Sequence, residues 1–88
     1  MATIRDLKKD INYVLGEIIE MALDWEKANP DADKKSTAAI IDEAITAFDS
    51  FSFRIYEKKI ENKRAHYRAI VNDLENKGNE LIAKLKSL

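Results

Sequence analysis

Hydrophobic residues recur at alternating spacings of three and four through the first third of the chain, and this pattern constrains the fold more than any other feature. The series comprises Ile4, Leu7, Ile11, Val14, Ile18, Met21, Trp25 and Ala28. Such spacing places apolar side chains along one face of an α-helix. A long amphipathic helix needs other elements to cover that face, so the pattern predicts an all-helical protein.

Two further helical patterns follow. The second comprises Ile41, Ala44, Phe48, Phe51 and Ile55, with Ile40 and Ile45 beside it, and the third comprises Tyr67, Val71, Leu74, Gly78, Leu81, Leu85 and Leu88. Extending the second register past Ile55 would place Lys58 in the core, which predicts a break between Tyr56 and Asn62. No glycine or proline marks that break, so one long helix, exchanged between two chains, is the alternative.

Local signals give the helix ends. Thr3 and Asp6 have the spacing of a capping box, which predicts that the first helix begins near residue 3. Pro30 disfavours helical geometry at Asn29, so this helix should end there. Three N-cap candidates for the second helix follow, namely Asp31, Asp33 and Ser36.

A chain of 88 residues has room for one core. We therefore expect a single domain over 1–88, with helices at about 3–29, 34–57 and 61–87. Because short loops join antiparallel neighbours, the predicted architecture is an all-α, antiparallel up-down-up three-helix bundle. Gly78 inside the third helix predicts a close approach of another helix, with fraying near 76–79 as the alternative.

The composition argues against several functions. Fifteen Lys and Arg against sixteen Asp and Glu give a net charge of -1, so no overall field attracts nucleic acid or a membrane. The chain has no cysteine, which removes disulfides and thiolate metal sites. The first residues lack the pattern of a signal peptide, and no stretch approaches the roughly 18 apolar residues of a membrane span. We expect a cytoplasmic protein that does not enter a membrane.

Catalytic motifs are missing from the sequence. The one histidine, His66, points away from the apolar face of the third helix, and no carboxylate lies near it at helical spacing. A carboxylate-bridged metal site needs a Glu three residues before a His, and Lys63 occupies that position. We find no phosphate-binding glycine loop, serine elbow or metalloprotease helix. The sequence therefore predicts no enzyme activity, no catalytic, cofactor or metal residues, and no small-molecule substrate.

A second apolar stripe on the first helix lies away from the main pattern. This candidate oligomer or partner surface comprises Tyr13, Gly16, Ile19 and Leu23. A three-helix bundle covers one broad face of each helix, so we expect the stripe to be partly exposed and to bind a second copy or a partner helix. The alternative is a wider core that includes these positions.

A basic stretch surrounds the predicted break. From Arg54 to Arg68, six basic residues oppose two acidic ones, with Tyr56 and Tyr67 among them. The candidate basic surface comprises Lys58, Lys59, Lys63, Arg64 and Arg68. Basic and aromatic side chains together are typical of nucleic-acid surfaces, but solvated helix ends are the favoured explanation of this charge, with nucleic-acid binding and then an acidic protein partner as the alternatives. From Glu17 to Asp33, six acidic residues oppose one basic residue, so opposite poles could pair between copies.

Residues 3–16 (TIRDLKKDINYVLG) and 40–44 (IIDEA) resemble a group of small all-helical bacterial proteins without an assigned function. The resemblance implies a bacterial helical protein and no activity, and it assigns no functional residue. We expect a non-enzymatic helical protein–protein interaction module that self-associates. A nucleic-acid-binding bundle that uses the basic surface is the alternative.

Overall fold

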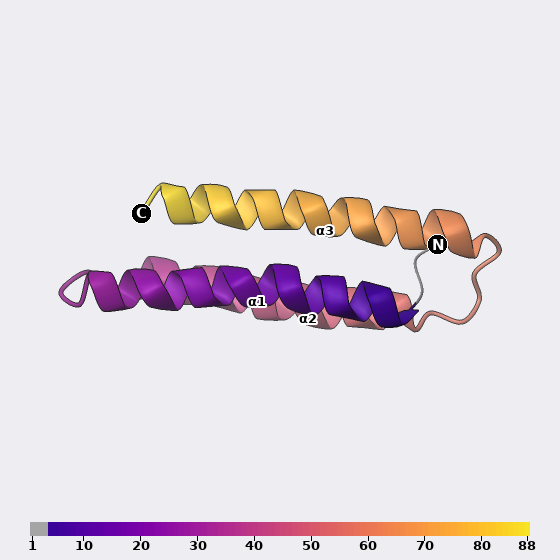
Figure 1. The fold of residues 1–88 in the computed structure, drawn as a ribbon, viewed down its shortest axis with the longest axis horizontal. Coiled ribbons are helices and arrows are strands. Elements are labelled where there is room, and N and C mark those ends of the chain that lie inside the picture. Colours follow the sequence, from indigo (N-terminus) through magenta and orange to yellow (C-terminus); the bar gives the residue numbers. More distant parts are fainter. Residues whose placement is uncertain (1–3) are drawn as a thin grey trace.

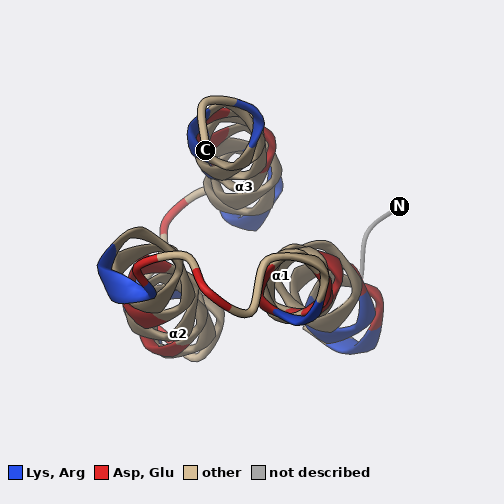
Figure 2. Cartoon of the chain, turned by 90° about the vertical axis from the view of Figure 1, so that its left-hand side faces the viewer, with Lys and Arg blue, Asp and Glu red and all other residues tan. Residues whose placement is uncertain are grey.

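The described part of the chain folds into three α-helices. The computed structural model describes residues 4–88, in which α1 spans Ile4–Ala28, α2 spans Lys35–Ile55 and α3 spans Lys63–Lys86. Each helix contacts both others, and the molecule measures 51 × 19 × 19 Å. The path runs along α1, back along α2 and forward along α3 (Figure 1), and the three helices form a triangle in the end view (Figure 2). The predicted all-helical class and three helices are confirmed.

The turn between α1 and α2 contains Pro30, as the sequence predicts. Asn29 donates from its backbone and side-chain amides to the Trp25 carbonyl at 3.0 Å, which closes the last turn of α1. At the start of α2, Asp33 Oδ1 accepts from the Lys35 amide at 2.9 Å. Lys34 occupies the N-cap position instead of a residue with a capping side chain. The proposed capping box depends on Thr3, which lies outside the described residues.

The break before α3 lies where the hydrophobic pattern predicts it. After Ile55 the chain leaves the helix, and α3 begins at Lys63. Asn62 is the N-cap, and its Oδ1 accepts from the Ala65 amide at 3.1 Å. The alternative of one long helix is therefore wrong. Asparagine is a favoured N-cap residue, so Asn62 was a usable signal for this boundary.

The buried face of each helix differs in part from the predicted one. The core comprises Leu7, Ile11, Leu15, Ile18 and Ala22 from α1, Ile40, Ala44, Ala47, Phe51 and Ile55 from α2, and Ile70, Leu74 and Leu81 from α3. In α1, Leu15 and Ala22 take core positions that the three-four pattern assigned to Val14 and Met21, and Met21 is 43% exposed. The three-four pattern has an average period of 3.5 residues, whereas a straight helix has 3.6 residues per turn. The patterned positions therefore shift around the helix by about 20° per heptad and leave the buried face.

Gly78 lies where α3 packs closely against α1. It is buried, and a Cβ atom there would lie 3.1 Å from Val14 Cγ1. The absence of a side chain thus allows the two helices to meet. The close-approach interpretation is confirmed, and fraying at this position is wrong.

Candidate functional site

The described residues offer little chemistry for catalysis. Within residues 4–88, no group of three or more His, Asp or Glu side chains could hold a metal ion. No helix in this range has a segment long and apolar enough to cross a membrane.

His66 connects two helices, contrary to the expectation of an exposed ring without a partner. Its side chain is half-buried, and Nε2 lies 2.7 Å from the Arg54 carbonyl oxygen, to which it donates. A Glu57 carboxylate oxygen lies 3.9 Å from the same nitrogen. These partners come from the end of α2 and the following loop, so spacing along α3 could not reveal them. The ring ties the first turn of α3 to the last turn of α2, which is a structural role.

Two contacts establish the register between the antiparallel helices α1 and α2. Near one end, the buried Thr37 hydroxyl donates to the Glu26 carboxylate. Near the other end, Lys8 Nζ lies 5.3 Å from the centre of the Tyr56 ring. Both helices rise by the same amount per residue. The two contacts therefore determine which residues of α1 and α2 lie at the same height along the stretch between them.

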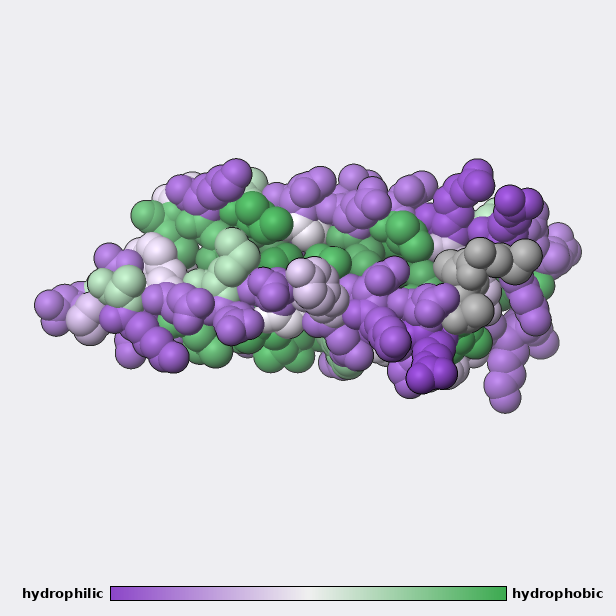
Figure 3. Space-filling view, in the orientation of Figure 1, coloured by the Kyte–Doolittle hydropathy of each residue, from purple (hydrophilic) through white to green (hydrophobic). Residues whose placement is uncertain are grey.

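This register sets hydrophobic residues of the two helices at the same heights. At 100° per residue, Leu23 lies on the opposite side of α1 from Val14, and Ile45 lies nearly opposite Glu43 on α2, and both Val14 and Glu43 face α3. The register sets Leu23 level with Ile41, Ile19 level with Ile45, and Gly16 level with Phe48. We call this surface the α1/α2 apolar face, and it comprises Gly16, Ile19, Leu23, Ile41, Ile45 and Phe48. Leu23, Ile45 and Phe48 are 44%, 48% and 38% exposed. Hydrophobic atoms are visible along the lower side of the molecule in Figure 3, the side away from α3.

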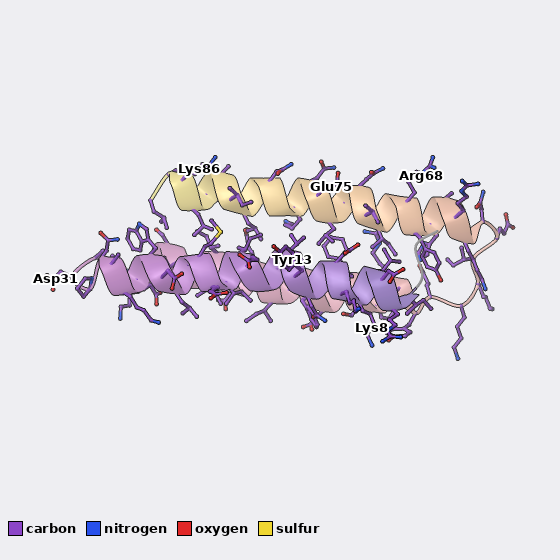
Figure 4. The ribbon with its side chains drawn as sticks, in the orientation of Figure 1. Lys8, Tyr13, Asp31, Arg68, Glu75 and Lys86 are labelled. Atoms are coloured by element: carbon purple, nitrogen blue, oxygen red, sulfur yellow. The ribbon has the colours of Figure 1, made fainter. Side chains whose placement is uncertain are left out.

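The predicted stripe on α1 is only partly brought together. Gly16 and Leu23 are exposed, whereas Ile19 is half-buried and packs against the core. Tyr13 is 71% exposed but lies about 120° around the helix from Ile19, on the outer side of α1 (Figure 4). The structure therefore groups three of the four residues.

The contribution of α2 to this face was missed. Ile41 and Phe48 were assigned to the core and Ile45 to its flank, yet Ile45 and Phe48 are exposed. A signal was present, because the apolar residues of α2 extend around the helix beyond the single face that its three-four pattern defines.

A second hydrophobic region lies between α1 and α3. Met21 is its exposed member, while Val71, Ile82 and Leu85 are half-buried against the core. Hydrophobic atoms between these two helices are visible in Figure 3. Because the α1/α2 apolar face exposes three large side chains and this region one, the former is the stronger candidate for an interface.

The predicted basic residues lie together at one end of the molecule without forming one patch. All five are exposed, and the Lys8 contact with Tyr56 brings the basic start of α1 to the same end. Arg68 and Lys8 point to opposite sides in Figure 4. Arg64 and Arg68 line an open groove of about 530 Å³ on α3. Tyr67 is half-buried against the core and offers little surface for stacking.

The opposite end of the molecule carries charges of both signs. Asp31 lies at the tip of the turn between α1 and α2 (Figure 4), and the end view shows acidic segments on that turn (Figure 2). Asp31, Asp33 and Asp24 are all exposed. Exposed Lys34 and Lys35 follow this turn, and the last turn of α3 brings Lys84 and Lys86 to the same end, so only the other end of the molecule has charge of predominantly one sign.

A groove of about 530 Å³ also runs between α2 and α3, with Phe51 in its lining. Two ion pairs cross between the helices, one from Lys84 to Glu43 at 2.7 Å and one from Arg54 to Asp73 at 2.8 Å. The hydrogen bond from Lys84 lowers the pKa of the Glu43 carboxyl, and the same bond raises the pKa of Lys84. No buried side-chain nitrogen or oxygen in the described range lacks a partner. The groove thus holds helix-to-helix contacts, and nothing in it points to a ligand.

In comparisons with known proteins, the chain matches no family model, no curated protein and no solved structure. The resemblance to small bacterial helical proteins therefore stays a prediction. Functional inference rests on the surfaces described above.

Proposed function

We propose that this protein is a non-enzymatic helical interaction module that self-associates through the α1/α2 apolar face. The observation that carries the proposal is the exposure of Leu23, Ile45 and Phe48 at neighbouring levels of two packed helices. Exposed hydrophobic side chains gathered in one place are typical of protein interfaces, whereas scattered ones are common on any surface.

The antiparallel three-helix bundle is the folded unit in this proposal. A pair of antiparallel helices has two sides on which a further helix can pack, and α3 occupies one of them. The α1/α2 pair of a second copy would occupy the other side and form a four-helix layer. Gly16 favours this arrangement, since among the described residues nothing lies within 4 Å of a Cβ atom built there. A neighbouring backbone could therefore approach closely.

The expected affinity is low. Full burial of a Leu, Ile or Phe side chain stabilises by about 1.5–3 kcal/mol, so covering the exposed part of each side chain contributes about 1 kcal/mol. A symmetric dimer covers Leu23, Ile45 and Phe48 on both copies, which amounts to about 6 kcal/mol. Association costs about 4–15 kcal/mol in lost translational and rotational freedom. The half-buried residues of the face must supply the remainder, so the dimer should form only at high protein concentration.

Sedimentation analysis over a wide concentration range tests the proposal. Leu23→Gln combined with Ile45→Gln should weaken association at least tenfold and leave the helical circular dichroism unchanged. These positions are preferable to Ile19, whose contact with the core would confound the result. Phe53→Ser is the matched control, because Phe53 is 75% exposed but lies outside the face. Equal dimerisation of the double variant and the wild type would contradict the proposal, as would a loss caused by Phe53→Ser alone.

The groove that contains Arg64 and Arg68 favours nucleic-acid binding as a second candidate function. Phosphate contacts weaken steeply between 50 and 200 mM salt. Fluorescence anisotropy with a single-stranded oligonucleotide should then show binding that falls over this range and is lost in Arg64→Glu/Arg68→Glu. Binding that ignores both changes would exclude this surface.

A further inference from the structure

The N-terminal segment of α3, residues 63–72, has basic residues and no acidic one. Over the longer range from Lys58 to Asn72, five Lys and Arg residues oppose one acidic residue, Glu61. The open groove on this segment is lined by both of its arginines, and Ala65 and Ala69 also line it. None of the lining residues comes from α1 or α2, so the groove opens outward from the bundle.

This segment of α3 also extends beyond the start of α1. A Cβ atom at Gly78 would lie 3.1 Å from Val14 Cγ1, so these two residues are nearly level in helices that run in the same direction (Figure 1). The first residue of α1, Ile4, lies ten residues before Val14, whereas the first residue of α3, Lys63, lies fifteen residues before Gly78. At 1.5 Å per residue, the start of α3 lies about 7 Å further out. A partner can therefore reach it without meeting α1.

Acidic neighbours limit where a negatively charged partner can bind. Glu75 lies on the same side of α3 as Arg68, about 10 Å further along the helix (Figure 4). On α1, Asp6 and Asp10 lie within about 80° of Val14, on the flank next to α3. A polyanion is therefore repelled by the later turns of α3 and by this flank of α1, and the N-terminal segment of α3 is the part that attracts it.

We infer that the N-terminal segment of α3 binds double-stranded DNA in the major groove. This inference rests on the proposed nucleic-acid binding, and it names the form of nucleic acid. The major groove is about 12 Å wide and admits an α-helix. Arginine binds guanine edges there, asparagine binds adenine edges, and alanine contacts the thymine methyl group. Arg68, Asn72 and Ala69 supply these three residue types in the outward-facing groove.

Single-stranded nucleic acid and duplex RNA fit this segment less well. Proteins that bind single strands stack the bases on exposed aromatic rings. The two rings of this segment, His66 and Tyr67, are both half-buried, and Tyr67 packs against the core. An RNA duplex has a deep, narrow major groove that side chains cannot read. A DNA duplex is therefore the form of nucleic acid that matches the exposed arginine, asparagine and alanine side chains.

Fluorescence anisotropy with three labelled probes of one sequence tests the inference. The probes are a DNA duplex of about 20 base pairs, one of its single strands, and the corresponding RNA duplex. At about 50 mM salt, the DNA duplex should bind at least about fivefold more tightly than either of the others. Equal or stronger binding of the single strand or of the RNA duplex would overturn the inference, while nucleic-acid binding itself would stand. If none of the probes binds, nucleic-acid binding fails as well.

The chain offers matched controls for variants of this segment. Positions 18 residues apart lie on the same side of a helix, about 27 Å from each other. Lys86 is thus the match for Arg68, and both side chains are exposed. Arg68→Gln should weaken binding of the DNA duplex about three- to tenfold and reduce its salt dependence by the equivalent of about one phosphate contact. Lys86→Gln should change the affinity by less than about twofold.

Ala83 is the corresponding match for Ala65, and both are exposed. Ala65→Leu should weaken duplex binding at least about threefold, because the longer side chain holds the helix away from the base edges, whereas Ala83→Leu should leave binding unchanged. Circular dichroism checks that all four variants stay helical. If Arg68→Gln and Lys86→Gln weaken binding equally, or if Ala65→Leu binds the duplex as the wild type does, α3 does not enter the groove and the inference is wrong.

Discussion

The two glycines provide a direct test of how closely α1 and α3 pack. Both lie inside helices, where replacing Gly by Ala stabilises by about 1 kcal/mol through helix propensity. At Gly16 a Cβ atom meets no described atom within 4 Å, so the full gain should appear. For a domain of this size, we expect the melting temperature of Gly16→Ala to rise by about 4–8 °C.

Gly78→Ala should behave differently. Its Cβ would lie 3.1 Å from Val14 Cγ1, whereas carbon atoms in favourable contact are about 3.5–4.0 Å apart. Valine has one strongly preferred rotamer in a helix, so Val14 cannot simply turn away. The helices must separate by a few tenths of an ångström, and such overpacking costs about 1–3 kcal/mol. After the propensity gain, Gly78→Ala should be about 0–2 kcal/mol less stable than the wild type.

Urea denaturation followed by circular dichroism measures both variants, at a concentration low enough to avoid self-association. Val14→Ala removes the methyl group that causes the conflict. In that background, Gly78→Ala should stabilise by about 1 kcal/mol, as Gly16→Ala does in the wild type. Equal stabilisation by Gly16→Ala and Gly78→Ala in the wild type would refute the close contact.

Three further changes test the core, an ion pair and a helix cap. Leu81→Ala should destabilise by about 2–5 kcal/mol because Leu81 is fully buried, whereas the exposed Met21 should cost less than about 1 kcal/mol when replaced by Ala. Similar losses of stability for the two variants in urea denaturation would contradict the observed core. The lowered pKa of Glu43 stabilises the fold above the ordinary value of 4.5, and this contribution is lost as the pH falls through the folded pKa. The melting temperature of Glu43→Gln should therefore fall less steeply with acidification than that of the wild type, and parallel curves would show that the Lys84 bond has no effect. Asn62→Ala should lower the free energy of unfolding by about 0.5–2 kcal/mol through loss of the N-cap, and unchanged stability would mean that the bond to Ala65 contributes nothing.

The limits of sequence analysis are clear from particular residues. The break between Tyr56 and Asn62 was predictable, because a continued helix would have buried lysine. The burial of Leu15 in place of Val14 was not, since adjacent positions on a helix differ in direction by about 100° and only the placement of neighbours decides between them. His66 shows the same limit, because both of its partners lie on other parts of the chain.

The sequence predicted the α1 part of the candidate interface but not the α2 part. Gly16, Ile19 and Leu23 stood out as a second stripe on one helix. Their grouping with Ile45 and Phe48 depends on the register of α1 against α2, which is visible in the Thr37 and Lys8 contacts.

The sequence by itself determined the all-helical class, the number of helices and the approximate position of each turn. These features depend on local periodicity and on the backbone limits of residues such as Pro30. Only the tertiary structure decided which side of each helix is buried, which hydrophobic residues remain exposed, and that the basic start of α1 lies at the same end as the basic residues around the break before α3. The physical reason is that the rotation of a helix about its axis is determined by all its neighbours together, and no local signal encodes it.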